Sequence, residues 1–156
     1  MGSNKDYLET LPKKRMSAGC LFFDDDGRVL LVKPTYKETW ETPGGIVEQG
    51  ESPKAGCRRE VLEELGLERE IGRLLLVSYN AASESKTESL VFVFEGGVLN
   101  SSEIERIKLA DDELSEYTFF SRDKLPEELS SSLRKRVLTA WKHYEDGGDP
   151  YLENRS

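Results

Sequence analysis

The sequence predicts a single layered domain of the α/β or α+β class. Two stretches have the apolar spacing of amphipathic helices, and short runs rich in Val, Ile, Leu and Phe lie before and between them. Helices interleaved with strands in this way pack as layers around one core. The 156 residues and the hydrophobic share of 37% are enough for one such core.

The N-terminal third predicts a hairpin and a tight turn. Residues 1–15 are polar and mixed in charge, so we expect a flexible segment there. Residues 21–32 predict a β-hairpin, because Asp26-Gly27 can supply the positive φ of its turn. The Pro-Gly-Gly run at residues 43–45 then forces a change of chain direction.

A helix is predicted to follow Ser52, whose side chain can accept a hydrogen bond from a free backbone N–H of the first turn. Pro53 suits the first helical position, where no backbone N–H is needed. The helix runs to about Leu65, and Gly66 is suited to the left-handed conformation that commonly ends a helix.

Three strands and a final helix complete the prediction. Residues 71–79, 90–94 and 117–120 are rich in β-branched, aromatic and aliphatic side chains, which favour strands. The final helix is indicated by apolar residues at helical spacing: Leu133, Val137, Ala140, Trp141 and Tyr144. We expect the domain to span residues 16–146 and residues 147–156 to form a flexible tail.

The charge balance excludes several classes of partner. The chain has 30 Asp and Glu against 22 Lys and Arg, and its net charge of −8 repels nucleic-acid polymers and anionic membranes. Binding of small phosphates therefore calls for a metal ion. The basic run Arg134-Lys135-Arg136 is interpreted as the solvated side of the last helix. Without an apolar stretch of roughly 20 residues or an apolar signal core, we expect a soluble, cytoplasmic protein.

Glu60, Glu63 and Glu64 form the most informative cluster. Their spacing of i, i+3 and i+4 places three carboxylates on one side of the predicted helix, where they would repel one another. Hard oxygen ligands at this density suit Mg²⁺ or Mn²⁺. The alternative is a solvated acidic helix face that continues to Glu68 and Glu70.

The sequence around this cluster resembles the signature of the Nudix hydrolases. That signature is Gly, five residues, Glu, seven residues, then Arg-Glu-aliphatic-any-Glu-Glu-any-Gly-aliphatic. Every specified place is filled in residues 45–67, by Gly45, Glu51, Arg59, Glu60, Val61, Glu63, Glu64, Gly66 and Leu67. The pattern of strands and the final helix extend the likeness over roughly residues 16–145.

The resemblance implies a Nudix-like α/β/α sandwich with a central mixed β-sheet and a loop-helix-loop catalytic motif. It implies hydrolysis of a diphosphate linkage in a nucleoside diphosphate joined to another moiety, such as a nucleoside triphosphate or a nucleotide sugar. The partner would then be a small molecule, and pairing into a homodimer is an option. Two other readings are a Nudix-like module that binds a nucleotide derivative without cleaving it and a protein-interaction domain, and the intact set of carboxylates argues against both.

The resemblance also implies roles for individual residues. Glu60, Glu63 and Glu64 correspond to metal ligands, with Glu63 and Glu64 in the catalytic set, and Gly44 corresponds to the residue whose carbonyl meets the metal. The expected ion is Mg²⁺ or Mn²⁺. Arg59 would orient the carboxylates as part of the catalytic machinery.

Two further supports are implied by the same resemblance. Glu51 lies close enough to the metal to assist, and Gly45 belongs to the turn in which a β-carbon would obstruct. The general base varies within the family and stays open here. Glu116, just before the strand at residues 117–120, is the preferred candidate; Glu113 and the carboxylates of the helix are the others.

Two aromatic residues are candidates for substrate contact. Trp40 precedes the Gly-Gly turn and could touch a base, and Tyr79 ends a strand where it could line a cleft. Ordinary packing of each ring is the alternative. Substrate identity is open, because Ser83 stands where subgroups that prefer ADP-ribose tend to carry Pro.

Overall fold

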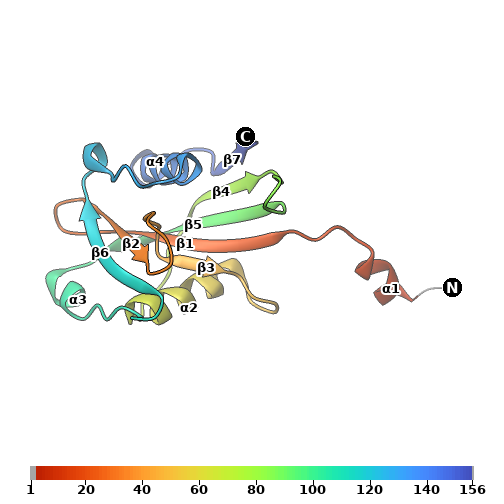
Figure 1. The fold of residues 1–156 in the computed structure, drawn as a ribbon, viewed down its shortest axis with the longest axis horizontal. Coiled ribbons are helices and arrows are strands. Elements are labelled where there is room, and N and C mark those ends of the chain that lie inside the picture. Colours follow the sequence, from red (N-terminus) through yellow and green to blue (C-terminus); the bar gives the residue numbers. More distant parts are fainter. Residues whose placement is uncertain (1–2, 156) are drawn as a thin grey trace.

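A mixed β-sheet forms the middle layer of the computed structural model, which describes residues 3–155 (Figure 1). Within those residues the sheet has seven strands in the order β6-β2-β1-β5-β4-β7, with β3 paired to β1. The strands are β1 (Arg15–Phe23), β2 (Val29–Pro34), β3 (Gly44–Ile46), β4 (Leu74–Asn80), β5 (Ser89–Val98), β6 (Leu114–Phe120) and β7 (Tyr151–Asn154). The α-helices are α1 (Asn4–Glu9), α2 (Pro53–Leu65), α3 (Ser101–Glu105) and α4 (Ser131–Asp146).

The central strand β1 joins the parts of the sheet. It runs parallel to β5 and antiparallel to β2 and β3. Its residues from Ala18 to Phe23 are all buried, as a strand covered on both faces requires. The predicted mixed sheet is confirmed.

Alternate residues of β1 pack on opposite layers. Cys20 and Phe22 join a core that includes Val61 of α2, whereas Leu21 and Phe23 join a second core on the side of α4. Figure 1 shows α2 on one face of the sheet and α4 on the other. The predicted α/β/α arrangement is therefore confirmed.

The helix that carries the acidic cluster has the predicted limits. The Ser52 hydroxyl accepts a hydrogen bond from the backbone N–H of Ala55 at 3.1 Å, and Pro53 occupies the first helical position. Gly66 closes the helix in the left-handed region, with φ of 69°. Both ends of α2 are thus fixed by the residues that predicted them.

Both predicted flexible segments contain regular structure. Residues 3–15 include α1, whose first turn is capped by mutual hydrogen bonds between Ser3 and Asp6. The sequence did not predict helix α1, because this helix buries no residue and therefore has no apolar period. In the tail, β7 pairs in parallel with β4 over only four residues. The expectation of flexibility for residues 1–2 and 156 lies outside the described residues.

Several strand limits also differ from the prediction: β1 begins earlier, at Arg15, and β5 extends over Ser89–Val98. Strand β4 begins at Leu74, because Ile71 packs into the core beside α2 without joining the sheet. Strand β6 begins at Leu114, so Glu116 lies within it. In the part of the chain that the structure describes, no helix is long and apolar enough to span a membrane.

Candidate functional site

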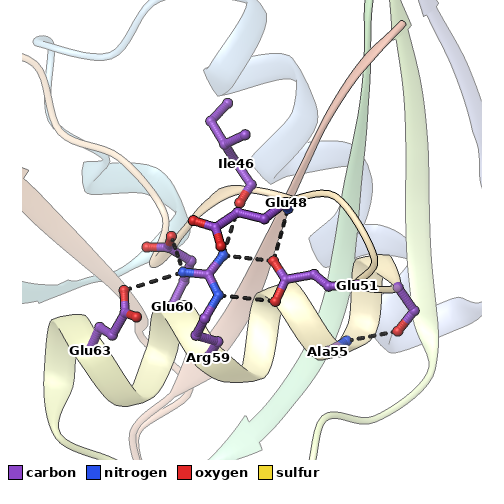
Figure 2. A network of polar contacts seen from close by, with 8 residues as sticks. Ile46, Glu48, Glu51, Ala55, Arg59, Glu60 and Glu63 are labelled. Carbon is purple, nitrogen blue, oxygen red and sulfur yellow. Dashed lines mark hydrogen bonds and ion pairs between the residues drawn. The ribbon is translucent and has the colours of Figure 1, made fainter. Parts of the chain in front are cut away.

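Arg59 is the centre of a network that joins α2 to the loop before it (Figure 2). Its guanidinium donates to both carboxylate oxygens of Glu51, at 3.0 and 2.7 Å. It also donates to Oε1 of Glu60 at 2.8 Å, to Oε2 of Glu63 at 3.3 Å and to the carbonyl of Ile46 at 3.1 Å. One planar cation therefore fixes three carboxylates and one loop carbonyl.

Glu51 anchors this network from the loop side. Besides Arg59, its carboxylate accepts the backbone N–H of Glu48 at 2.9 Å. The hydrogen bonds from Arg59 and from this N–H lower the pKa of Glu51 to about 2. Glu51 therefore stays ionised at neutral pH, and it holds Arg59 beside the α2 carboxylates.

Glu60 is packed against the Gly45 backbone. A β-carbon on Gly45 would lie 2.5 Å from the Glu60 carboxyl carbon, so glycine is required for this approach. Burial, together with the nearby charges of Glu63 and Glu113, raises the pKa of Glu60, and Arg59 opposes the shift.

Glu64 is the most buried of the three carboxylates, with 8% of its surface exposed. Its Oε1 accepts the backbone N–H of Gly44 at 2.7 Å. Burial, with the charges of Glu60, Glu113 and Glu41, raises the pKa of Glu64 to about 8 although this hydrogen bond opposes the shift. Gly44 itself has φ of 148°, and a β-carbon there would lie 2.2 Å from the Ala18 carbonyl oxygen.

The three carboxylates are the type of ligand that a divalent cation prefers, although in this structure their oxygens do not converge on one point. Across residues 3–155, no three Asp, Glu, His or Cys side chains stand close enough to hold a metal ion. Glu60 and Glu63 are turned toward Arg59, and Glu64 is turned toward Gly44. The donors are all hard oxygens, and a cation would favour the ionised forms of Glu60 and Glu64, whose pKa values are raised by burial first and by neighbouring carboxylates second.

A cleft of about 770 Å³ opens beside this cluster. One end is acidic and is lined by Glu41, Glu60, Glu64 and Glu113. The walls include Trp40 and the first turns of α4. The carboxylates are therefore placed beside a space that is large enough for a small-molecule ligand.

The structure places Glu113 on this cleft, whereas Glu116 is not among its lining residues within the described chain. Glu116 is exposed on β6, where it pairs with Lys33 of β2. Because β6 starts at Leu114, Glu116 is the third residue of the strand, whereas Glu113 lies in the turn before it. This placement favours Glu113 over Glu116 as a residue of the cleft, and the identity of the general base stays a prediction.

The two aromatic candidates have different surroundings. Trp40 lines the cleft but is only 8% exposed, and its ring packs edge-on against Phe120 at 5.1 Å between centroids. The Tyr79 hydroxyl donates to Glu88. Tyr79 is absent from the described cavity linings, while its neighbour Asn80 lines a second cavity. Tyr79 and Asn80 differ in this way because alternate strand residues face opposite ways, and a contact between Tyr79 and substrate stays a prediction.

Sequence reasoning missed Arg136 as a cleft residue. Its side chain lines the cleft and is half-buried, so the interpretation of residues 134–136 as a wholly solvated run is wrong at this position. The signal was available in the spacing: Arg136 lies three residues after Leu133 and four before Ala140, both of which are buried.

The chain is similar to known proteins over most of its length. A family model described as "NUDIX domain" matches residues 13–142. A MutT-like protein of Streptomyces ambofaciens is 29% identical over 145 residues, which cover 92% of this chain and 84% of the relative. The diphosphoinositol polyphosphate phosphohydrolase 2 of Rattus norvegicus is 38% identical over 76 residues, which span only 42% of that protein.

A solved structure has the same fold. The MutT protein of Methanosarcina mazei Go1 superposes with a TM-score of 0.70 at 26% sequence identity. The superposition covers 87% of this chain and 96% of that one.

Proposed function

The chain belongs to the NUDIX domain family, and on this premise we propose that it is an active, metal-dependent pyrophosphohydrolase. Its substrate is a small molecule in which a nucleoside diphosphate is joined to another moiety by a diphosphate linkage. The observation that carries the proposal is the complete set of three carboxylates on α2. Arg59 holds Glu60 and Glu63, the Gly44 N–H holds Glu64, and Glu60 and Glu64 line the cleft.

The proposed metal ligands are Glu60, Glu63 and Glu64, with the carbonyl of Gly44 as a further oxygen donor. Nudix hydrolases generally need a divalent metal ion, and we propose Mg²⁺ or Mn²⁺. When bound, such an ion would neutralise charge on phosphate oxygens and lower the pKa of the attacking water. The high pKa of Glu64 supports this assignment, because a buried carboxylate among like charges favours a bound cation.

Arg59 and Glu51 are proposed to position the ligands. The bidentate contact with Glu51 holds the guanidinium flat beside α2, and the remaining nitrogen orients Glu60 and Glu63. Neither residue needs to touch the substrate. Their contribution is to keep the carboxylates in one arrangement during the reaction.

Glu113 is proposed as the general base. It lines the same cleft as Glu60 and Glu64, and its charge contributes to the raised pKa of both. Its carboxylate would accept the proton of the water that attacks phosphorus, while the diphosphate linkage breaks. The other candidates for the base are Glu116 and the carboxylates of α2.

The test is a screen of purified protein with Mg²⁺ or Mn²⁺ against several phosphoanhydride classes. These are nucleoside triphosphates, nucleotide sugars, dinucleoside polyphosphates, ADP-ribose and diphosphoinositol polyphosphates, with release of phosphate or diphosphate as the readout. Turnover of at least one nucleotide class supports the proposal, whereas turnover of diphosphoinositol polyphosphates alone would support the hydrolase and contradict the nucleoside diphosphate substrate. If the protein binds compounds of one class but does not cleave them with either metal ion, the result would favour the alternative, a non-catalytic module that binds a nucleotide derivative.

A further inference from the structure

The cleft continues beyond the acidic cluster into a second cavity of about 790 Å³. The two cavities share five lining residues: Ser17, Lys86, Val91, Ser132 and Arg136. They are therefore neighbouring parts of one depression, which leads from the α2 carboxylates to the loop between β4 and β5. A ligand that reaches from one part into the other would pass Arg136.

The two parts of this depression differ in charge. The first cavity is lined by four glutamates and also by Lys37, Lys86 and Arg136, whereas the second is lined by Arg15, Lys86 and Arg136 and, within residues 3–155, by no Asp or Glu. Most of its other lining side chains are hydroxyls and amides of Ser, Thr and Asn. A carboxylate-free group of three cations is notable in a chain of net charge −8. This end therefore suits an anion.

Arg136 is the cation with the clearest need for such a partner. It is half-buried, and among the described residues its side chain makes no hydrogen bond and no ion pair, while its neighbour Arg134 donates to the Pro126 carbonyl at 2.6 Å. Burial lowers the pKa of Arg136, and the charge of Glu41 opposes this shift without a direct contact; a guanidinium keeps its charge in a protein. A partly desolvated cation without a partner is unfavourable, and an anionic ligand would remove that penalty.

The other two cations are held around the same space. Arg15 donates to the Thr87 hydroxyl at 2.7 Å and to the Thr87 carbonyl at 2.9 Å, which fixes the chain beside Lys86. Lys86 is exposed and, within residues 3–155, forms no ion pair. The second cavity has no aromatic side chain in its described lining, so it offers no ring on which a nucleobase could stack.

We propose that the cavity lined by Arg15, Lys86 and Arg136 binds a phosphate group of the substrate that is remote from the diphosphate linkage. The inference rests on the proposed function and narrows its substrate class to phosphoanhydrides that carry at least one additional phosphate. Arg136 gives the bidentate contact, and Lys86 adds a mobile charge at the entrance.

The first experiment measures binding without catalysis. Inositol hexakisphosphate, a polyphosphate that has no anhydride bond, is titrated calorimetrically into the metal-free protein and into R136Q, K86Q and K135Q. Lys135 is the matched control, since it is an exposed cation on the same helix that lines neither described cavity. We expect R136Q and K86Q each to weaken binding about tenfold or more, and K135Q to change it less than about twofold.

Two results would overturn the proposal. One is an absence of binding to the wild-type protein, and the other is an equal loss in K135Q and R136Q, which would indicate unspecific attraction. Circular dichroism tests whether R136Q is folded, and the exposed position of Lys86 makes K86Q an independent variant.

The second experiment measures kinetics on matched substrate pairs that differ by one remote phosphate, such as coenzyme A and its 3′-dephospho form. For a pair that the wild-type enzyme cleaves, we expect R136Q to raise KM about tenfold or more for the phosphorylated member only, with kcat unchanged. Equal wild-type KM values for both members of every cleaved pair would contradict the proposal. If binding follows the expected pattern but no substrate is cleaved, the proposed function fails while the phosphate site stands.

Discussion

The Glu64 carboxylate accepts the backbone N–H of Gly44 at 2.7 Å, and this contact joins α2 to the start of β3, which pairs with β1. The contact is formed by a carboxyl group whose pKa is raised to about 8, chiefly by burial. At neutral pH the metal-free site therefore retains a proton, which a bound cation would displace.

A first prediction concerns the stability of the metal-free protein. The unfolded chain releases the Glu64 proton near pH 4.5, whereas the folded chain keeps it to about pH 8. The folded state thus binds more protons in this window, so this group's contribution to the free energy of unfolding falls as pH rises from 4.5 to 8. Glu64→Gln removes the contribution. In excess chelator, urea denaturation should find E64Q close to wild type at pH 4.5 and more stable by roughly 2 kcal/mol or more at pH 8.

The difference between the two proteins isolates Glu64 from other titrating groups. A difference that stays constant from pH 4.5 to pH 8 would show that Glu64 does not carry the raised pKa.

The two glycines of the turn should respond differently to alanine. At Gly45 the new β-carbon would meet the Glu60 carboxylate, which can swing away, so G45A should stay folded but lower kcat about tenfold or more. At Gly44 the obstacle is the Ala18 backbone and φ is positive, so G44A should lose roughly 2–4 kcal/mol of stability. Thermal unfolding and turnover measure the two effects.

Gly50→Ala is the matched control for this pair. Gly50 also has a positive φ of 82°, but nothing lies within 4 Å of its added β-carbon. It should lose only about 1 kcal/mol, from backbone strain, and keep its activity. Full activity in G45A would disprove the tight approach of Glu60 to this turn.

A further prediction tests the role of Arg59 as a positioning residue. Lysine cannot reproduce the bidentate contact with Glu51 or reach Glu60 and Glu63 together, so R59K should lower kcat by about 10-fold to 10²-fold. R58K, on the exposed side of the same helix, should be close to wild type. Steady-state kinetics at saturating metal gives the comparison. An equal effect of the two substitutions would disprove the role of Arg59 in positioning the α2 carboxylates.

The general base is tested by comparing two acidic residues three positions apart. Glu113→Gln should lower kcat about 10²-fold with little change in KM and flatten the acidic limb of the pH–rate profile. Glu116→Gln should leave kcat and the pH–rate profile unchanged, because Glu116 is exposed on β6 and is not among the described lining residues of the cleft. The reverse pattern would restore Glu116 as the base.

The sequence was informative where local signals decide the structure. Ser52, Pro53 and Gly66 define both ends of α2 through contacts within a few residues, so the helix and its row of carboxylates could be predicted. The hairpin turn followed in the same way from Gly27, which has φ of 76°.

Features that depend on tertiary packing could not be derived in this way. Whether Glu113 or Glu116 lies on the cleft depends on where β6 starts beside β2. Whether the Tyr79 side chain lies on the cleft depends on which face of β4 meets it. Strand β7 is too short to give a period, and it exists because β4 offers an edge for pairing. Arg136 is different, because its position was available from the sequence. Its spacing from Leu133 indicated the packed face of α4, but the basic residues beside it favoured the interpretation as a solvated run.

The most direct test of the central claim measures turnover of the best substrate class from the screen in three samples. These are the wild-type protein with Mg²⁺ or Mn²⁺, the wild-type protein in excess chelator, and Glu63→Gln with the same metal. We expect activity only with metal, full recovery when metal is restored, and a loss in kcat of at least about 10²-fold in E63Q with an unchanged circular dichroism spectrum. Undiminished turnover in excess chelator, or a wild-type rate in folded E63Q, would contradict the account and return the α2 carboxylates to a solvated acidic face.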